Sequence, residues 1–232
     1  MTDDGGAPVI AIDGPGGVGK GTLSRRLAGS LDFHLLDSGA LYRLVALGAE
    51  EQSVATDDAE GLAALAEGLD VAFRLDAGDD LARPLLHGRA VGEELRSERC
   101  GDSASRIAAY PQVRAALLAR QRAFRRPPGL VADGRDMGSV VFPDAGLKIF
   151  LTASVEERAQ RRLKQLIAKG IGANLAPLLR EISARDKRDR ERSVAPMKPA
   201  SDAVVIDTTA LGIDEVFAQV MRIARERGIS GP

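Results

Sequence analysis

The sequence predicts an α/β fold, in which helices cover both faces of a central parallel sheet. One observation is that short apolar runs, such as residues 9–12 and 147–151, alternate along the chain with stretches of helical periodicity. A second is that these runs are apolar throughout, as expected for strands that are buried on both faces. The 232 residues suffice for one such domain with a subordinate insertion.

The core elements can be predicted in chain order. A strand over residues 9–12 precedes a helix over 23–31, and a short strand over 35–36 ends at Asp37 before a helix over 41–49. A pair of helices is predicted over residues 104–124, divided at Tyr110-Pro111 because the residue before proline disfavours helix. Three further strands are predicted over residues 129–132, 147–151 and 203–206.

A different pattern occupies residues 70–96. Strand-like residues over 71–75 and 85–86 are separated by turn-forming residues over 76–80, and a second turn is predicted at residues 87–89. This segment interrupts the alternation of helices and strands. We therefore predict a small inserted sheet of short antiparallel strands.

The charges nearly cancel but are unevenly distributed. There are 32 cationic and 33 anionic residues, and 26 of the cations are arginines. Residues 1–70 carry a net charge of −8, whereas residues 158–192 carry +7. A chain without a global basic excess is not expected to bind nucleic acid or a membrane surface. The local basic block is compatible with a site for small anions.

Other totals exclude further classes of protein. The single cysteine, Cys100, excludes an intrachain disulfide, and the acidic N-terminal segment is unlike a signal peptide. No apolar run approaches the roughly 18 residues of a membrane span. Aromatic residues make up only 3% of the chain, so platforms for base stacking are not expected. We expect a cytoplasmic monomer that binds neither nucleic acid nor membrane.

A glycine-rich loop between the first strand and the first helix carries the clearest chemical signal. Such a loop points successive backbone N–H groups into one concavity, which binds phosphate together with the helix N-terminus. Gly21 separates Lys20 from Thr22, a spacing typical of nucleotide kinases that phosphorylate monophosphates. The residues expected to form this phosphate site are Gly14, Pro15, Gly16, Gly17, Val18, Gly19, Lys20, Gly21 and Thr22.

Polar side chains follow two further strands, at the edge of the sheet where ligands of parallel sheets bind. Asp37, Ser38 and Arg43 follow the second strand. Equally, Asp37 or Ser38 could cap the next helix, with Arg43 merely exposed. Asp133 directly follows the strand over 129–132 and is placed to hold water on Mg²⁺, with Arg135 and Asp136 next to it. An Arg-Asp pair in a turn could also be a weak surface ion pair.

The basic block contains two arginine clusters, over residues 158–164 and 185–192. They could form solvated helix faces with ion pairs between neighbouring turns. Guanidinium groups are also suited to bidentate phosphate binding, and phosphoryl transfer depends on neutralising charge on the transferred group. An arginine-bearing lid over two phosphorylated substrates would in addition exclude water.

Taken together, these segments resemble the bacterial cytidylate kinases, the CMP/dCMP kinases among the nucleoside monophosphate kinases. The matching segments are residues 12–22, 36–43, 132–145, 148–154, 185–192 and 199–203. The resemblance implies a P-loop fold with a monophosphate-binding insertion and a short arginine-rich lid. The implied divisions are core over 1–37, monophosphate-binding region over 38–103, core over 104–157, lid over 158–178 and core over 179–232.

The resemblance also implies ATP and Mg²⁺ as cofactors, with residues 14–22 at the phosphates of ATP, and a direct in-line transfer from ATP to CMP or dCMP. Thr22 and, through water, Asp133 would hold the metal, and Lys20 would act in catalysis. The remaining implied roles are Arg43 and Arg135 at the CMP phosphate, Ser38, Ser105, Arg114 and Asp136 at cytosine, Arg185 and Asp189 toward the sugar, and Arg158, Arg162, Arg188 and Arg192 at the transferring phosphoryl group.

Asp136 and Arg114 together match cytosine, because the carboxylate can accept from its amino group and the guanidinium can donate to its two acceptors. Uracil would place an oxygen opposite the carboxylate and leave both groups unpaired. Alternatives are a P-loop kinase for another small acceptor, a nucleotide switch and a nucleic-acid-binding module. The chain lacks the Asn-Lys-x-Asp base reader of GTP switches. His34 and His87 are expected to lie outside the site.

Overall fold

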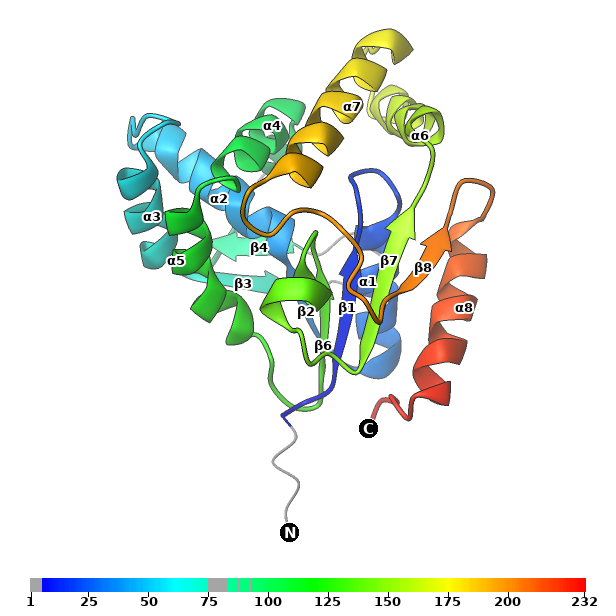
Figure 1. The fold of residues 1–232 in the computed structure, drawn as a ribbon. Coiled ribbons are helices and arrows are strands. Elements are labelled where there is room, and N and C mark those ends of the chain that lie inside the picture. Colours follow the sequence, from blue (N-terminus) through cyan, green and yellow to red (C-terminus); the bar gives the residue numbers. More distant parts are fainter. Residues whose placement is uncertain (1–5, 75–82, 87, 92) are drawn as a thin grey trace.

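The computed structural model, drawn in Figure 1, describes residues 6–74, 83–86, 88–91 and 93–232. The described residues form a parallel five-stranded sheet in the order β2-β6-β1-β7-β8. Its strands are β1 (Val9–Asp13), β2 (His34–Asp37), β6 (Leu130–Asp133), β7 (Leu147–Thr152) and β8 (Val204–Asp207). The predicted α/β fold and all five predicted core strands are confirmed.

Each face of this sheet packs against its own set of helices. Val9 and Ala11 of β1 belong to the core shared with α2 (Ser38–Glu51), α3 (Ala59–Gly68), α4 (Glu98–Ile107) and α5 (Pro111–Arg122). Ile10 and Ile12 face α1 (Lys20–Leu31) and α8 (Ile213–Glu226). This alternation follows from the period of two in a strand, and each fully buried isoleucine contributes about 1.5–3 kcal/mol.

The predicted insertion is also confirmed. Strands β3 (Val71–Arg74), β4 (Arg83–Leu86) and β5 (Arg89–Ala90) form an antiparallel sheet. The ring of Phe73 lies 5.5 Å from that of Phe124, between centroids, which attaches this sheet to the main core. The turn predicted over residues 76–80 and His87 lie outside the described residues.

The first helix of the predicted pair begins earlier than the sequence pattern indicates. Helix α4 starts at Glu98 rather than near residue 104, because Ser97 caps it by accepting a hydrogen bond from the Cys100 N–H at 3.1 Å. Helix α3 is not predicted by the pattern. The proposed divisions at 103/104 and 178/179 fall inside α4 and inside α7 (Leu175–Glu191).

The carboxyl ends of the parallel strands meet at one edge of the sheet. Helices α6 (Val155–Ala168) and α7 lie over this edge, whereas the described part of the chain begins and ends at the opposite edge (Figure 1). Ser154 caps α6 by accepting a hydrogen bond from the Glu157 N–H. Among the helices of the described ranges, none is long and apolar enough to cross a membrane.

Candidate active site

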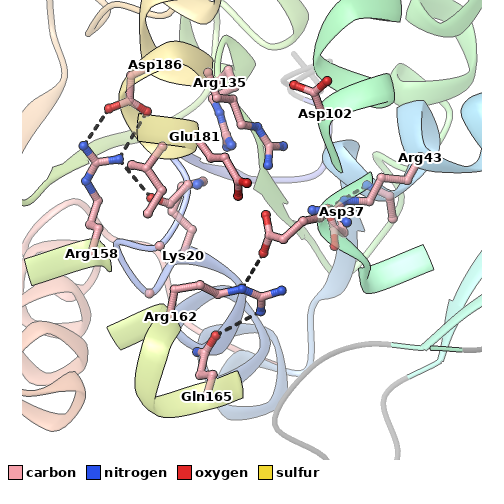
Figure 2. A pocket seen from close by; sticks show the side chains of 18 of the residues that line it. Lys20, Asp37, Arg43, Asp102, Arg135, Arg158, Arg162, Gln165, Glu181 and Asp186 are labelled. Atoms are coloured by element: carbon pink, nitrogen blue, oxygen red, sulfur yellow. Dashed lines mark hydrogen bonds and ion pairs between the residues drawn. The ribbon is translucent and has the colours of Figure 1, made fainter. Parts of the chain in front are cut away.

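A cavity of about 620 Å³ opens at the carboxyl edge of the sheet, a size suited to a small ligand. The glycine-rich loop forms its floor, and α2, α4, α6 and α7 contribute to its walls. Figure 2 shows the side chains of Lys20, Arg43, Arg135 and Arg158 gathered around it. The cavity therefore combines the predicted phosphate loop with arginines from distant parts of the chain.

The glycine-rich loop has the backbone geometry of a phosphate site. Gly14 has φ of +140°, and a Cβ there would lie 2.2 Å from the carbonyl oxygen of Leu151, so no other residue fits. Within the described chain, no side chain caps α1 at Gly19. The first N–H groups of α1 are thus left for an anion.

The amine of Lys20 is held inside this loop. Its Nζ donates a hydrogen bond to the carbonyl oxygen of Pro15 at 2.9 Å and lies 3.9 Å from the carboxylate of Asp133. Burial, followed by the positive charge of Arg135, lowers the pKa of Lys20 to about 8. Burial also raises the pKa of Asp133 to about 6. An anionic phosphate in the cavity would favour the charged form of Lys20.

Three arginines from separate elements converge beside the loop. Arg43 donates to the carbonyl oxygen of Leu95 at 2.7 Å, and a Cβ on Gly101 would lie 3.0 Å from Arg43 Nη2 and 3.1 Å from Arg185 Nη1. Burial, then the charges of Arg135 and Arg43, lowers the pKa of Arg185 to about 10. Of the carboxylates in the described ranges, none lies within 4.0 Å of Arg185. The cluster is therefore suited to bind an anion.

A smaller cavity adjoins the first, since Arg135 and Arg185 line both. A buried ion pair between Arg114 and Asp136 lies in its wall. Its further lining residues include Ser38, Tyr42, Ser105, Asp189 and Arg192.

Asp189 connects several groups of this smaller cavity. It accepts a hydrogen bond from Ser105 Oγ at 2.9 Å and pairs with Arg135 at 3.1 Å and Arg192 at 2.9 Å. Burial alone would raise the pKa of Asp189, but the charges of Arg135 and Arg192 outweigh it and lower that pKa. Asp189 is therefore ionised and fixes the positions of both arginines.

Asp13, the last residue of β1, holds the loop that carries Asp136. Its carboxylate accepts hydrogen bonds from the N–H groups of Met137 at 2.7 Å and Gly138 at 2.8 Å. These residues begin η2 (Met137–Val141), a π-helical turn, a feature frequent at functional sites. Burial raises the pKa of Asp13 to about 7.

The arginines predicted to clamp the phosphoryl group are paired with carboxylates. Arg158 donates to both oxygens of Asp186, at 3.1 and 2.6 Å, and to the carbonyl oxygen of Gly16 at 3.2 Å. Arg162 pairs with Glu98 of α4, while Arg188 pairs with Asp102 of the same helix. Both contacts join the basic block to α4.

Comparison with known proteins identifies the family. A family model described as cytidylate kinase matches residues 10–226. The chain belongs to the cytidylate kinase family. It is 56% identical over 214 residues to the cytidylate kinase of Nitrosococcus oceani, covering 92% of this chain and 94% of that protein. It is 58% identical over 217 residues to that of Bordetella pertussis, covering 94% and 95%.

Most of the site residues that the sequence predicts lie together in the structure of this cytidylate kinase-family chain. The large cavity is lined by Gly16, Gly17, Gly19, Lys20, Gly21, Thr22, Arg43, Arg135, Arg158, Arg162 and Arg185. The smaller one is lined by Ser38, Ser105, Arg114, Arg135, Asp136, Arg185, Asp189 and Arg192. Gly14, Pro15, Val18, Asp133 and Arg188 are not among the described residues that line either cavity.

Two alternatives left open by the sequence can now be resolved. Asp37 does cap α2, because it accepts a hydrogen bond from the Ala40 N–H at 3.0 Å, and it also lines the large cavity. Arg43, on the same helix, is directed into the cavity rather than merely exposed. Asp136 forms a buried pair rather than a surface one.

Several residues in or directly behind this site carry no role in the sequence-based prediction. They are Asp13, Gly101, Gln121 and the carboxylate partners Glu98 and Asp102. Asp13 carried a usable signal, since it is a carboxylate at the end of an apolar strand. The others depend on contacts between distant segments.

Gly101 provides a test of the arginine cluster. In Gly101→Ala, the added methyl group pushes against both Arg43 and Arg185, so we expect the KM for CMP to rise roughly 5-fold. The KM for ATP should not change, and the melting temperature should not fall, because alanine favours helix by about 1 kcal/mol over glycine. Steady-state kinetics and thermal unfolding measure these effects. An equal rise in the KM values for CMP and ATP would contradict the assignment of Arg43 and Arg185 to the CMP side of the cavity.

Proposed function

We propose that this protein transfers the terminal phosphoryl group of ATP to CMP or dCMP, giving ADP and CDP or dCDP. The observation that carries this proposal is the buried Arg114–Asp136 pair in the cavity that adjoins the phosphate loop. The Asp136 carboxylate accepts and the neighbouring Arg114 guanidinium donates, which matches the amino group and the ring acceptors of cytosine. The family membership and the names of the relatives support it.

The phosphate loop and Lys20 hold the phosphates of ATP. The N–H groups of the loop and the amine of Lys20 neutralise the negative charge of these phosphates. No covalent intermediate is needed, because phosphoryl transfer depends mainly on positioning and electrostatics. Arg43 and Arg135 bind the phosphate of CMP on the other side of the cavity. Arg185, expected toward the sugar with Asp189, lies close enough to Arg43 to contribute to the same anion site.

The basic block acts on the group in transfer. Arg158 and Arg162 line the large cavity and are placed to neutralise the equatorial oxygens, whereas Arg188 and Arg192 are assigned this role from family resemblance. On binding, these arginines exchange carboxylate partners for phosphate oxygens. We assign residues 158–178 as a lid that closes at this stage and excludes water.

The residues present fit Mg²⁺ that arrives with the nucleotide. In the described part of the chain, no cluster of three or more His, Cys, Asp or Glu side chains could hold a metal alone. Mg²⁺ is commonly bound by one or two carboxylates together with substrate phosphates. Thr22, which lines the cavity, and Asp133, through water, would hold it. The ion would supply charge neutralisation on the phosphates.

A panel of acceptors tests the proposed reaction. Release of ADP is measured in a coupled assay with CMP, dCMP, UMP, AMP and GMP, each with ATP and Mg²⁺. We expect CMP and dCMP to have the highest kcat/KM. Preference for another monophosphate, or for a phosphorylated sugar, would favour the alternative of a P-loop kinase with a different acceptor.

We also propose that the protein acts as a monomer in the cytoplasm, with small nucleotides as its only ligands. The balanced charge supports the part of this proposal that excludes nucleic acid and anionic membrane, because binding of either depends on a basic excess.

A further inference from the structure

We infer that Gln121 is a positioning residue that sets the discrimination between cytosine and uracil by fixing the direction of the Ser38 hydroxyl. The inference rests on the proposed function, since it requires the base to bind in the smaller cavity. It concerns a residue to which the mechanism above gives no role.

Gln121 lies behind the wall of the smaller cavity. It belongs to α5, is 2% exposed, and is not among the described residues that line that cavity. Ser38, the first residue of α2, does line the cavity and is 3% exposed. Its Oγ donates a hydrogen bond to Gln121 Oε1 at 3.1 Å. Gln121 therefore affects a bound base through Ser38.

This hydrogen bond determines what Ser38 offers to the base. A hydroxyl has one hydrogen to donate and lone pairs that accept. Because the hydrogen is directed to Gln121, Ser38 can only accept in the cavity. Asp136, on the same cavity, is also an acceptor.

Two acceptors select for an amino group. The 4-amino group of cytosine has two hydrogens and can satisfy both Ser38 and Asp136. The oxygen at the same position of uracil would face two acceptors, which leaves buried polar groups unpaired. The fixed direction of the Ser38 hydroxyl thus acts against uracil as well as in favour of cytosine.

Tyr42 lines the same cavity as Ser38, and its ring centroid lies 5.7 Å from the guanidinium of Arg114. Burial raises the pKa of Tyr42 to about 12, and the positive charge of Arg114 opposes that rise. The phenol is therefore neutral near pH 7 and adds no negative charge beside Asp136.

The test replaces Gln121 with methionine, which has a similar volume and no amide. In Gln121→Met, the Ser38 hydroxyl is free to turn and donate to uracil. We expect the ratio of kcat/KM for CMP to kcat/KM for UMP to fall roughly 10-fold, partly through a gain with UMP. The KM for ATP should be unchanged. If Gln121 only supported the fold, both pyrimidines would be affected equally and the ratio would stay constant.

Ser38→Ala supplies the matched control. It should lower kcat/KM for CMP without lowering that for UMP, and adding Gln121→Met to it should not change the ratio further. An equal loss with CMP and UMP in Ser38→Ala would show that the hydroxyl donates as readily as it accepts, and would overturn the inference even if Gln121→Met does not fold.

The two proposals fail in different ways. A wild-type enzyme that does not prefer CMP would overturn the proposed function. A wild-type enzyme that prefers CMP, with an unchanged ratio in Gln121→Met, would overturn only the role of Gln121. That second result is also expected if the amide were reversed, with its NH₂ group donating to Ser38.

Discussion

Replacing Lys20 with methionine is expected to lower kcat about 10²–10³-fold, the usual effect of removing one preorganised donor from a charge-stabilising site. The amine is held against the Pro15 carbonyl inside the phosphate loop, so its loss removes a positive charge that water cannot replace. The measurement is single-turnover phosphoryl transfer to CMP. Lys198→Met, at an exposed position, is the control and should retain full activity.

The pH dependence gives the same prediction a second readout. The pKa of Lys20 is lowered to about 8, so the free enzyme loses this charge as the pH rises through that value. We expect kcat/KM for ATP to decline above about pH 8. A profile that stays flat to pH 10 would show that the charge on Lys20 is not required for ATP capture.

The second large effect is expected at Arg158, where stability and catalysis can be separated. Arg158 is 1% exposed and pairs with the buried Asp186. Arg158→Met leaves the buried Asp186 with only the longer, exposed contact to Arg190 at 3.7 Å. Losing the main partner of a buried carboxylate typically costs about 3–5 kcal/mol of unfolding free energy. If Arg158 also stabilises the phosphoryl group, kcat should fall about 10³-fold or more.

The double variant Arg158→Met/Asp186→Leu distinguishes the two roles. Replacing both partners with apolar groups should restore most of the stability but none of the lost kcat. Urea denaturation and the coupled assay measure the two quantities. Recovery of activity along with stability would mean that Arg158 is structural. Arg162→Met, whose partner Glu98 is 45% exposed in its side chain, should lower kcat with little effect on stability.

The elements that the sequence predicts best are those whose own residues determine their form. The five core strands are apolar on both faces, and the phosphate loop needs glycine at positions such as Gly14 for reasons of backbone geometry. The start of α4 is harder to predict, because Glu98, Arg99 and Asp102 hide its helical period. Its buried positions include the small residues Gly101, Ala104 and Ser105.

Pairing within the site could not be predicted from local sequence. Arginine side chains are long, and several acids compete for each, so the partners of Arg158 and Arg188 follow only from how α4, α6 and α7 pack. The hydrogen bond between Ser38 and Gln121 spans 83 positions and leaves no local pattern. The family resemblance did assign Asp136 and Arg114 to the base, and the structure places both in one cavity.

The attachment of the Asp136 loop to Asp13 has a consequence for substrate length. Strand β1 leads directly into the phosphate loop, and its last carboxylate also holds the N–H groups that follow Asp136. The phosphate loop and the loop that carries Asp136 are thereby attached to the same strand end. For the proposed reaction, this attachment helps to set the distance between the phosphates of ATP and the base in the smaller cavity. It therefore favours a nucleoside monophosphate over a nucleoside, which is shorter, and over a nucleoside diphosphate, which is longer.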